Sequence, residues 1–525
     1  MIDHSWRWQQ VQIHDLLLTS ADKTPDAPMV HENGTWHSYA AICSIARHVA
    51  CHLVEKVGAT PGSRVAVFWE NSAAAIAASF GVWIAGCVLV PINTDMKGDD
   101  LVYQIEHSDS VAVIVGRKQM RHLLAIAANL SAVASIVADG PLPPATSISA
   151  SCVAWQKVAE SGDEMAEPVR SIDIDLAAIV YTSGSTGRPK GVMLTHLNLV
   201  SNTRSIVQYL KLSSRDSVMM ILPHFYIYGL SLILTHTMVG GAVVLDNRFM
   251  YPNTVLDAMV QTQVTGFAGV PSTFSILLAR SVVREKEFPS LRYVTQAGGG
   301  MPIAVQQEVA AAFAPAELFI MYGATEASPR LSYLEPSLLS EKWGSIGKAV
   351  PNVEVLVADE TGNRLPAGTE GEIAARGANI TSGYWKDPEA SKSVLRNGLY
   401  FTGDLGTMDA EGFIYVTGRA KDILKVKGFR VSPAEIEEHI ADMEGVRQAA
   451  VIGVPDQVLG EAPVAYLELS DSTVAADTIR AHLQRELPPY KVPIDYVVVD
   501  NLPKNAAGKI QKTVLRDQYQ GLSDE

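Results

Sequence analysis

Short apolar runs alternate with longer amphipathic segments along the first 350 residues or so of the chain. Residues 27–39 predict a hairpin around Asn33-Gly34, and residues 38–58 predict a helix that Ser38 caps and Gly58 ends. Further strand-like runs cover residues 63–69, 87–91, 111–115, 135–139 and 176–182. Because strands that alternate with helices form parallel sheets with helices on their faces, this pattern predicts an α/β domain.

One stretch is apolar over nearly its whole length. Residues 73–92, "AAAIAASFGVWIAGCVLVPI", have the length of a membrane span. The stretch is rich in Ala and Gly, breaks near Gly86, and ends in a strand-like "CVLV" before Pro91. A buried helix followed by a buried strand explains it better than a membrane span.

The pattern changes from about Pro351 onward. Residues 353–377 and 398–419 are short strand-like runs separated by Gly- and Asp-rich turns, which predicts an antiparallel region. After Arg419 a lysine-rich connector leads to Ser432-Pro433, an N-cap and first helical residue, and then to a compact α+β unit of about 100 residues. We place the main boundary near residues 419–421. The predicted parts are residues 1–418, with a β-rich subdomain at 350–418, and residues 422–525.

Composition and charge narrow the class of protein. The chain has 525 residues, of which 47% are hydrophobic, and a formal net charge of −14. This acidity argues against binding to nucleic acids or anionic membranes, which require clustered cations. The four cysteines show no CxxC spacing, and neither end carries a recognisable targeting signal, so we expect a cytoplasmic protein.

A loop after one predicted strand has the residues of a phosphate-binding site. "YTSGSTGRPKG" (residues 181–191) offers hydroxyls, glycines that permit close backbone approach, and one lysine charge. It is not a Walker loop, because Arg188-Pro189 separates Gly187 from Lys190 and no Ser or Thr follows the lysine. The composition therefore favours phosphate binding by another kind of loop.

The order of residues in this loop resembles the signature of the adenylate-forming acyl ligases, which include acyl-CoA synthetases, luciferases and the adenylation domains of peptide synthetases. Other segments resemble the remaining motifs of that family in the same order: "MYGATEAS" (321–328), "YFTGDLG" (400–406), "GRAKDILKVKGFRVSPAEIE" (418–437) and "LPKNAAGKIQK" (502–512). The chain is identified as a free-standing member. The resemblance implies an α/β fold with a large N-terminal domain of helix-covered sheets and a small β-rich subdomain, followed by a small mobile α+β C-terminal domain.

The resemblance implies a reaction in two halves. A carboxylate attacks the α-phosphorus of ATP, which releases pyrophosphate and leaves an acyl-adenylate, and a second nucleophile then displaces AMP. Positioning and charge stabilisation can drive the first half without a protein nucleophile. The implied cofactors are ATP and Mg²⁺, with coenzyme A as the default co-substrate.

Family motifs assign roles around the triphosphate. The loop residues that would handle the departing phosphates are Thr182, Ser183, Gly184, Ser185, Thr186 and Lys190. Thr325 would face the α-phosphate. Glu326 resembles the family's magnesium ligand, and a hard carboxylate suits that cation.

Other motif residues would hold the adenosine. The resemblance assigns this role to Gly299, Gly300, Met321, Tyr322, Gly323, Asp404 and Arg419. Tyr322 would stack on adenine, and Asp404 would accept hydrogen bonds from the ribose hydroxyls with help from Arg419.

Three roles in the last part of the chain also follow from the resemblance. Lys509 would bridge the substrate carboxylate and the α-phosphate, and it is the strongest single catalytic candidate. Lys421 would be the hinge about which the small domain swings between the two half-reactions. Lys425, Lys427 and Gly428 would then be carried toward the acceptor tunnel.

The acyl pocket is expected around Gly298 and the segment that begins with His224, Phe225 and Tyr226. Peptide-synthetase domains for α-amino acids usually carry an aspartate in this segment, whereas residues 224–234 contain no acid. An unpaired buried ammonium would be costly, so we expect a hydrophobic carboxylate that is not an α-amino acid. Aryl ligases often have histidine where this chain has Tyr226, which leaves an aromatic acid undecided. We expect His196 to be structural.

The acceptor stays open at this stage. Coenzyme A is the most frequent in the family, but a carrier-protein phosphopantetheine or an amino acid amine, as in coronafacate-type ligases, fits the same chemistry. Two other classes of protein fit the sequence less well. A non-catalytic nucleotide sensor is disfavoured by the intact Lys509, Glu326 and Asp404, and nothing in the sequence favours a luciferase-like oxygenase.

Overall fold

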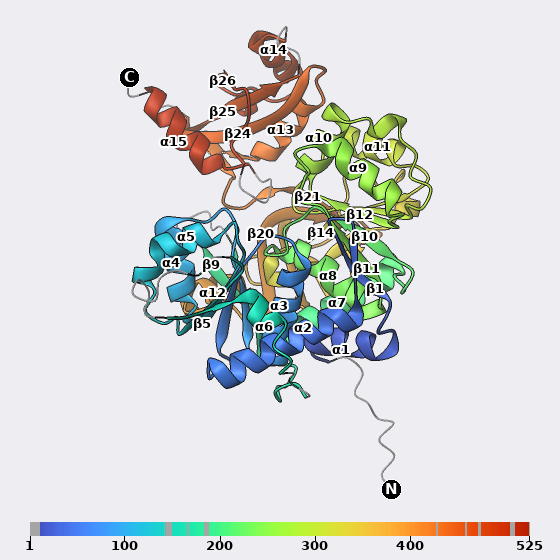
Figure 1. Cartoon of the computed structure of the whole chain (residues 1–525). Helices are drawn as coiled ribbons and strands as arrows, with labels where there is room; N and C mark the ends of the chain where they lie inside the picture. The colour runs from blue at the N-terminus through green and yellow to red at the C-terminus, as the bar shows by residue number, and fades with distance from the viewer. Residues whose placement is uncertain are drawn as a thin grey trace.

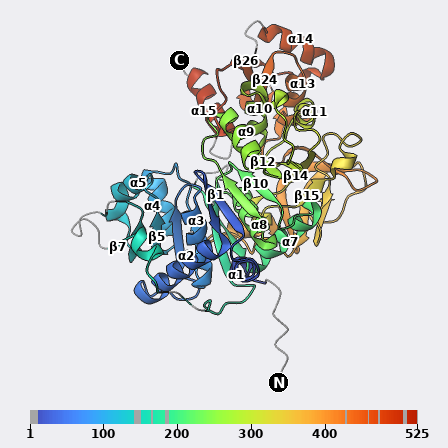
Figure 2. The same cartoon turned by 45° about the vertical axis from the view of Figure 1, so that its right-hand side comes forward.

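The computed structural model describes residues 11–140, 142, 150–163, 165, 167–182, 188–426, 429–456, 459–470, 474–504 and 510–523. The chain forms two helix-covered sheets, then a β-rich part, then a C-terminal α/β part (Figures 1 and 2). This arrangement confirms the predicted fold class.

The first sheet has a parallel centre with antiparallel strands at its ends. Its strand order is β16 (Lys348–Ala349), β15 (Ser332–Leu334), β14 (Glu317–Tyr322), β13 (Tyr293–Gln296), β12 (Gly266–Gly269), β10 (Ser217–Met220), β11 (Ala242–Leu245), β1 (Pro28–Glu32) and β2 (Thr35–Ser38). Strands β1 and β10 to β14 run parallel to their neighbours in this centre. Their carboxyl ends therefore share one edge, where open α/β sheets bind ligands.

The second sheet is parallel except at one end. Its order is β7 (Ser151–Ala154), β6 (Ser135–Ala138), β5 (Ser110–Val115), β3 (Arg64–Phe68), β4 (Val88–Pro91), β8 (Leu176–Thr182) and β9 (Lys190–Thr195). Strands β8 and β9 are antiparallel and flank the phosphate-type loop, with Thr182 opposite Lys190.

One layer of helices packs between the two sheets. These helices are α1 (Ile13–Lys23), α2 (Tyr39–Cys51), α3 (Ala73–Ile84), α7 (His196–Leu210) and α8 (Ile227–Val239). Along β3 the side chains alternate: Val65 and Val67 face this central layer, whereas Ala66 and Phe68 face the outer helices α4 (Gly98–His107) and α5 (Met120–Ile126). Both faces of the strand are buried, as its continuous apolar run predicts.

The outer face of the first sheet is covered by α9 (Pro252–Gln261), α10 (Pro271–Arg280) and α11 (Ile303–Ala312) (Figure 1). The β-rich part is an antiparallel sheet of β17 (Val353–Ala358), β18 (Gly371–Gly377), β19 (Leu395–Arg396), β20 (Leu399–Met408) and β21 (Ile414–Arg419). It confirms the antiparallel region predicted after Pro351.

The C-terminal part has its own sheet and core. Its strands are β22 (Leu424–Val426), β23 (Phe429–Val431), β24 (Val446–Asp456), β25 (Gly460–Leu469) and β26 (Asp495–Val498), and its helices are α13 (Pro433–Ala441), α14 (Ala476–Glu486) and α15 (Lys512–Ser523). Helix α13 begins at Pro433 with Ser432 as its N-cap, as predicted, but the Ser432 side chain accepts no capping hydrogen bond and its hydroxyl donates to the Thr417 carbonyl (2.6 Å).

Local signals in the sequence match the helix and turn boundaries. Asn33 and Gly34 have φ of 49° and 84°, as the hairpin turn requires. Ser38 and Ser72 each accept a hydrogen bond from the third residue of the helix they begin. The apolar stretch forms α3 and β4, and no helix in the described ranges has the length and apolarity needed to cross a bilayer.

A buried histidine fixes the start of α7 against α1. The Ile13 amide donates to His196 Nδ1 at 3.2 Å, and the rings of His14 and His196 lie 6.0 Å apart. Burial, with a smaller contribution from His14, lowers the pKa of His196 from 6.5 to about 3. His196 is therefore neutral and structural, as expected.

We expect acid to weaken this contact before it weakens surface contacts. Since the pKa of His196 is lowered in the folded state, the unfolded chain binds the proton first. The stabilisation is therefore complete above pH 6.5 and is lost progressively toward pH 3. At pH 5 the loss is about 2 kcal/mol. Thermal unfolding of His196→Gln and of the wild type at pH 7.5 and pH 5 measures it.

The variant should be less stable at neutral pH but should lose less stability on acidification. The comparison variant is His482→Gln on helix α14, which should lose as much stability on acidification as the wild type does. An unchanged pH dependence in His196→Gln would contradict the assignment.

Candidate functional site

A tyrosine and an arginine hold the carboxylate of Asp404. The antiparallel register of β20 and β21 places Asp404 opposite Arg419, whose Nε lies 2.9 Å from Oδ1. The Tyr322 hydroxyl donates to Oδ2 at 2.6 Å. Burial and then the Asp404 charge raise the pKa of Tyr322, and Asp404 raises the pKa of Arg419. Three predicted residues from distant segments thus meet, and the carboxylate is held in one orientation.

Glu326 lies in η4 (Thr325–Ala327), the short 3-10 turn after β14, next to Thr325. The Tyr384 hydroxyl donates to Glu326 Oε1 at 2.7 Å. On the same tyrosine, the ring centroid lies 5.2 Å from the Nζ of Lys190. One tyrosine therefore connects the predicted metal ligand with the lysine of the phosphate-type loop.

Residues 381–385 bring Tyr384 to this position by pairing with β9. The Met193 amide donates to the Gly383 carbonyl at 2.9 Å, and the Trp385 amide donates to the Gly191 carbonyl at 2.7 Å. The amide of Thr381 donates to the backbone carbonyl of Glu326 at 2.8 Å. Tyr384 is not among the residues predicted from the sequence, because its contact joins residues 58 positions apart and no local pattern indicates it.

Strand β14 presents its last residues to opposite sides. The Met321 sulfur faces the core, 2.9 Å from the Tyr209 hydroxyl and 3.3 Å from Arg330 Nε, whereas Tyr322 faces Asp404. Gly323 has no space for a side chain, since a Cβ there would overlap the Pro329 carbonyl. The turn that carries Thr325 and Glu326 therefore depends on this glycine.

The glycine loop follows β13 at the same edge. Gly298 has a φ of 92°, in the left-handed region, and the Gln296 side chain donates to the Gly299 carbonyl at 2.8 Å. Around Gly300, a Cβ would meet nothing within 4 Å. The third glycine of this loop therefore borders open space.

The predicted acyl segment is mostly buried. His224 is 1% exposed, and its backbone amide and Nδ1 lie 2.8 and 3.1 Å from Asn71 Oδ1. Burial lowers its pKa to about 4, so the ring is neutral, and its Nε2 has no hydrogen-bond partner within the described chain. Phe225 is buried against Tyr226, which begins α8, with ring centroids 4.6 Å apart.

The remaining predicted residues divide into two groups. Lys421 lies exposed in the turn between β21 and β22, and Lys425 is exposed on β22 with its amide bonded to Glu461. The predictions that lie outside the described residues are Ser183, Gly184, Ser185, Thr186, Lys427, Gly428 and Lys509.

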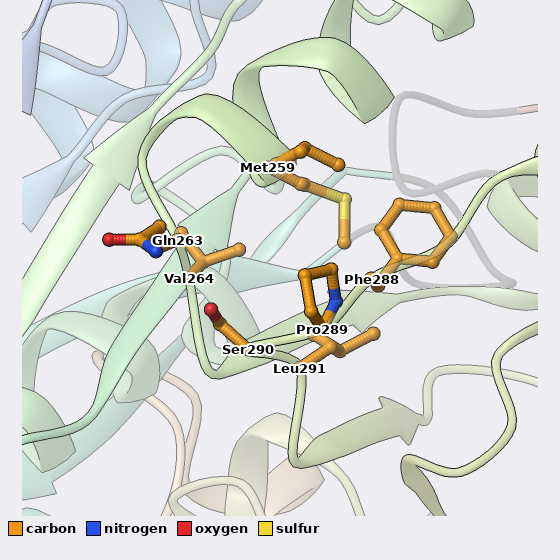
Figure 3. Close-up of a pocket in the computed structure, with 8 residues that line it drawn as sticks. Met259, Gln263, Val264, Phe288, Pro289, Ser290 and Leu291 are labelled. Atoms are coloured by element: carbon orange, nitrogen blue, oxygen red, sulfur yellow. The ribbon is translucent and has the colours of Figure 1, made fainter.

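A separate small hollow lies beside the end of α9 (Figure 3). Its volume of about 10 Å³ leaves room for about one water molecule. The residues around it are Met259, Val260, Gln263, Val264, Phe288, Pro289, Ser290 and Leu291, none of which is a predicted site residue.

Comparison with known proteins assigns the family. The AMP-binding enzyme family matches residues 17–385, and the AMP-binding enzyme C-terminal domain matches residues 435–509. The chain belongs to the AMP-binding enzyme family and is an ATP-dependent, AMP-forming ligase. This confirms the resemblance that the motifs indicated.

Relatives cover almost the whole chain. A feruloyl-CoA synthase from Amycolatopsis sp is 33% identical over 515 residues, which is 95% of this chain and 97% of the relative. The ATP-bound structure of MatB from Rhodopseudomonas palustris has a TM-score of 0.87 at 30% identity and covers 98% of this chain and 99% of its own. MenE from Bacillus subtilis, solved with ATP and a magnesium ion, has a TM-score of 0.81 at 26% identity, covering 96% and 99%.

We expect Gly323→Ala to disrupt the turn after β14. The new Cβ would overlap the backbone of Pro329, which cannot move aside as a flexible side chain can, so the variant should lose about 1–3 kcal/mol or more of stability. Gly300→Ala provides the matched comparison, because its Cβ would enter open space. Thermal unfolding should separate the two variants, and equal unfolding temperatures would contradict the close approach.

Proposed function

We propose that the protein activates a hydrophobic carboxylate, other than an α-amino acid, as an acyl-adenylate and transfers the acyl group to coenzyme A. The observation that carries this proposal is the convergence of Asp404, Glu326 and Lys190 around two tyrosines at the edge of the sheets. The relatives support the acceptor, since a feruloyl-CoA synthase is among them.

Asp404 would recognise the ribose of ATP. Its two oxygens are oriented before any ligand binds, so accepting hydroxyl hydrogen bonds would cost little reorganisation. Tyr322 would supply an aromatic surface for the adenine, and Gly298, Gly299 and Gly300 would let the backbone approach the ring. Thr325 would lie toward the α-phosphate.

Glu326 would hold magnesium together with the phosphate oxygens of ATP. Within the described residues, no group of three or more His, Cys, Asp or Glu side chains could hold a metal by itself. One carboxylate plus substrate phosphates is a usual arrangement for this cation, and Tyr384 holds only Oε1 of the carboxylate. The cation would neutralise the charge of the departing pyrophosphate.

Two lysines would complete the charge balance. Lys190 would hold the β- and γ-phosphates with the neighbouring loop residues. Lys509 would contact the carboxylate and the α-phosphate, where negative charge develops in the transition state.

Different observations support the proposed class of acid and the proposed acceptor. Residues 224–234 contain no acidic side chain, so the segment offers no partner for a substrate ammonium. The apolar helix α8 favours a hydrophobic body on the acid. Coenzyme A is proposed over an amine or a carrier-protein phosphopantetheine because the curated relatives are CoA ligases.

The first experiment tests a panel of carboxylic acids against several possible acceptors. Carboxylic acids, ATP and Mg²⁺ are incubated with coenzyme A, with amino acids, or with no acceptor, and the products are identified by mass spectrometry. We expect a thioester with coenzyme A. An amide in its place would replace the proposed acceptor, and the absence of an adenylate with any acid would refute the activity.

We expect Lys509→Ala to reduce ATP–pyrophosphate exchange by about a hundredfold to a thousandfold, because one charge-stabilising contact is lost. Lys512, which pairs with Glu437 at 2.6 Å, offers a neighbouring control. Lys512→Ala should keep exchange within a few-fold of the wild type. Wild-type exchange in Lys509→Ala would exclude the proposed role.

We propose that residues 419–421 form a hinge between residues 1–418 and 422–525, with Lys421 as the pivot. A bulky ring at this exposed position should hinder backbone rotation, so Lys421→Trp should spare pyrophosphate exchange and block thioester formation. The control is Lys392→Trp on α12 (Pro388–Val394), an exposed lysine away from the hinge. Equal loss of both half-reactions in Lys421→Trp would count against the hinge.

A further inference from the structure

A buried cation lies beside the proposed acyl pocket. Arg330 is 3% exposed and follows the turn that carries Glu326. Its Nε lies 3.3 Å from the Met321 sulfur, and its guanidinium carbon lies 4.1 Å from the centroid of the Tyr228 ring. In the described part of the chain, no carboxylate forms an ion pair with it.

This environment is unusual for a buried charge. A guanidinium stays protonated at any pH at which proteins fold, and burying it without an anion is strongly unfavourable. A second arginine that lies over a tyrosine ring is paired with a carboxylate, as is usual. Arg292 also lies over a tyrosine ring, at 4.9 Å from Tyr293, but its Nε and Nη2 bind Asp216 Oδ1 at 3.1 and 2.8 Å.

Arg330 lies where the proposed walls of the acyl pocket meet. Tyr228, on which it stacks, belongs to the segment at residues 224–234 that we propose for the acyl group. The Tyr228 hydroxyl donates to the Thr295 carbonyl at 3.1 Å, on the strand that leads into the glycine loop. The missing side chain of Gly323 lets the Arg330 backbone pack directly against the end of β14.

The charges nearest the acyl segment differ in where they lie. The acyl segment has no acid that could pair with an ammonium, and the buried ionised group next to it is a cation. A guanidinium offers two parallel N–H donors that match the two oxygens of a carboxylate. The tyrosine ring and the thioether around it fit an apolar chain leading to that carboxylate.

We infer that Arg330 binds a second carboxylate on the substrate, remote from the one that reacts. The preferred acids are then dicarboxylates with an apolar body. This inference rests on the proposed function, since it names the acid that the same site activates.

The test compares acids in matched pairs by ATP–pyrophosphate exchange. Each pair is a monoacid and the dicarboxylic acid of equal chain length, or an aryl acid and its analogue with a second ring carboxylate. The wild type should prefer the diacid. Arg330→Met should lower kcat/KM for the diacid about a hundredfold and leave the monoacid within a few-fold, because only the diacid loses a charged partner.

Two further variants distinguish the loss of a substrate contact from a folding defect. Arg330→Lys keeps the charge without the planar fork, so it should retain part of the diacid preference. Arg292→Met removes another tyrosine-stacked arginine and should lower the unfolding temperature without changing the ratio of diacid to monoacid activity. This ratio does not depend on the fraction of folded enzyme.

Several results would overturn the inference. They are an unchanged diacid preference in Arg330→Met, an equal loss for both members of a pair, and a wild-type preference for the monoacid or for an analogue whose second carboxylate is a carboxamide. Equal loss would mean that Arg330 holds the reacting carboxylate or only stabilises the fold. Failure of the proposed function gives a different result, namely no exchange by the wild type with any acid.

Discussion

The turn after β14 is the constraint on which the site depends. Gly323 packs without a side chain against the Pro329 carbonyl, and this close approach folds the chain back on itself within a few residues. As a result, one short segment points three side chains in different directions, those of Tyr322, Glu326 and Arg330. Tyr322 meets Asp404, Glu326 meets Tyr384, and Arg330 meets Tyr228.

The charged groups of the site differ in how many hydrogen-bond and ion-pair partners the described protein groups provide for them. Asp404 has a partner on each oxygen, which suits the rigid, neutral-ribose site that we propose for it. Glu326 accepts a hydrogen bond through Oε1 from the neutral Tyr384 hydroxyl, and among the described residues no basic side chain forms a salt bridge with it. Arg330 has aromatic and sulfur neighbours but no carboxylate in the described chain. These differences are consistent with the proposed ligands, namely a neutral ribose at Asp404, a metal ion with phosphates at Glu326 and a carboxylate at Arg330.

The sequence predicts those features whose cause is local. The hairpin turn at Asn33-Gly34, the caps at Ser38 and Ser72, and the buried strand β3 each follow from neighbouring residues. Motif order also led to Tyr322, Glu326 and Asp404, of which Tyr322 and Asp404 contact each other.

Features that depend on distant segments were missed. Tyr384 reaches Glu326 only because residues 381–385 pair with β9, and the sequence does not reveal this pairing. The role that we propose for Arg330 is suggested only once its burial is known, together with the fact that no described carboxylate forms an ion pair with it. The hydrogen bond from the Ser432 hydroxyl to the Thr417 carbonyl likewise joins segments that no local pattern brings together.

Asp404, the residue that we propose for ribose binding, is connected to the proposed hinge through the pairing of β20 with β21. Asp404 is paired in register with Arg419, and the Ala420 amide donates to the Gly403 carbonyl at 2.9 Å. The ladder therefore fixes the backbone as far as Ala420, and Lys421 is the first residue beyond it. A rotation of the C-terminal part that starts at Lys421 would release the Asp422 amide from the Arg419 carbonyl (3.0 Å) and the Ser432 hydroxyl from the Thr417 carbonyl, but it would leave the side-chain contacts of Asp404 with Arg419 and Tyr322 in place. The nucleotide could then stay in place while the catalytic groups of the C-terminal part are exchanged between the two half-reactions.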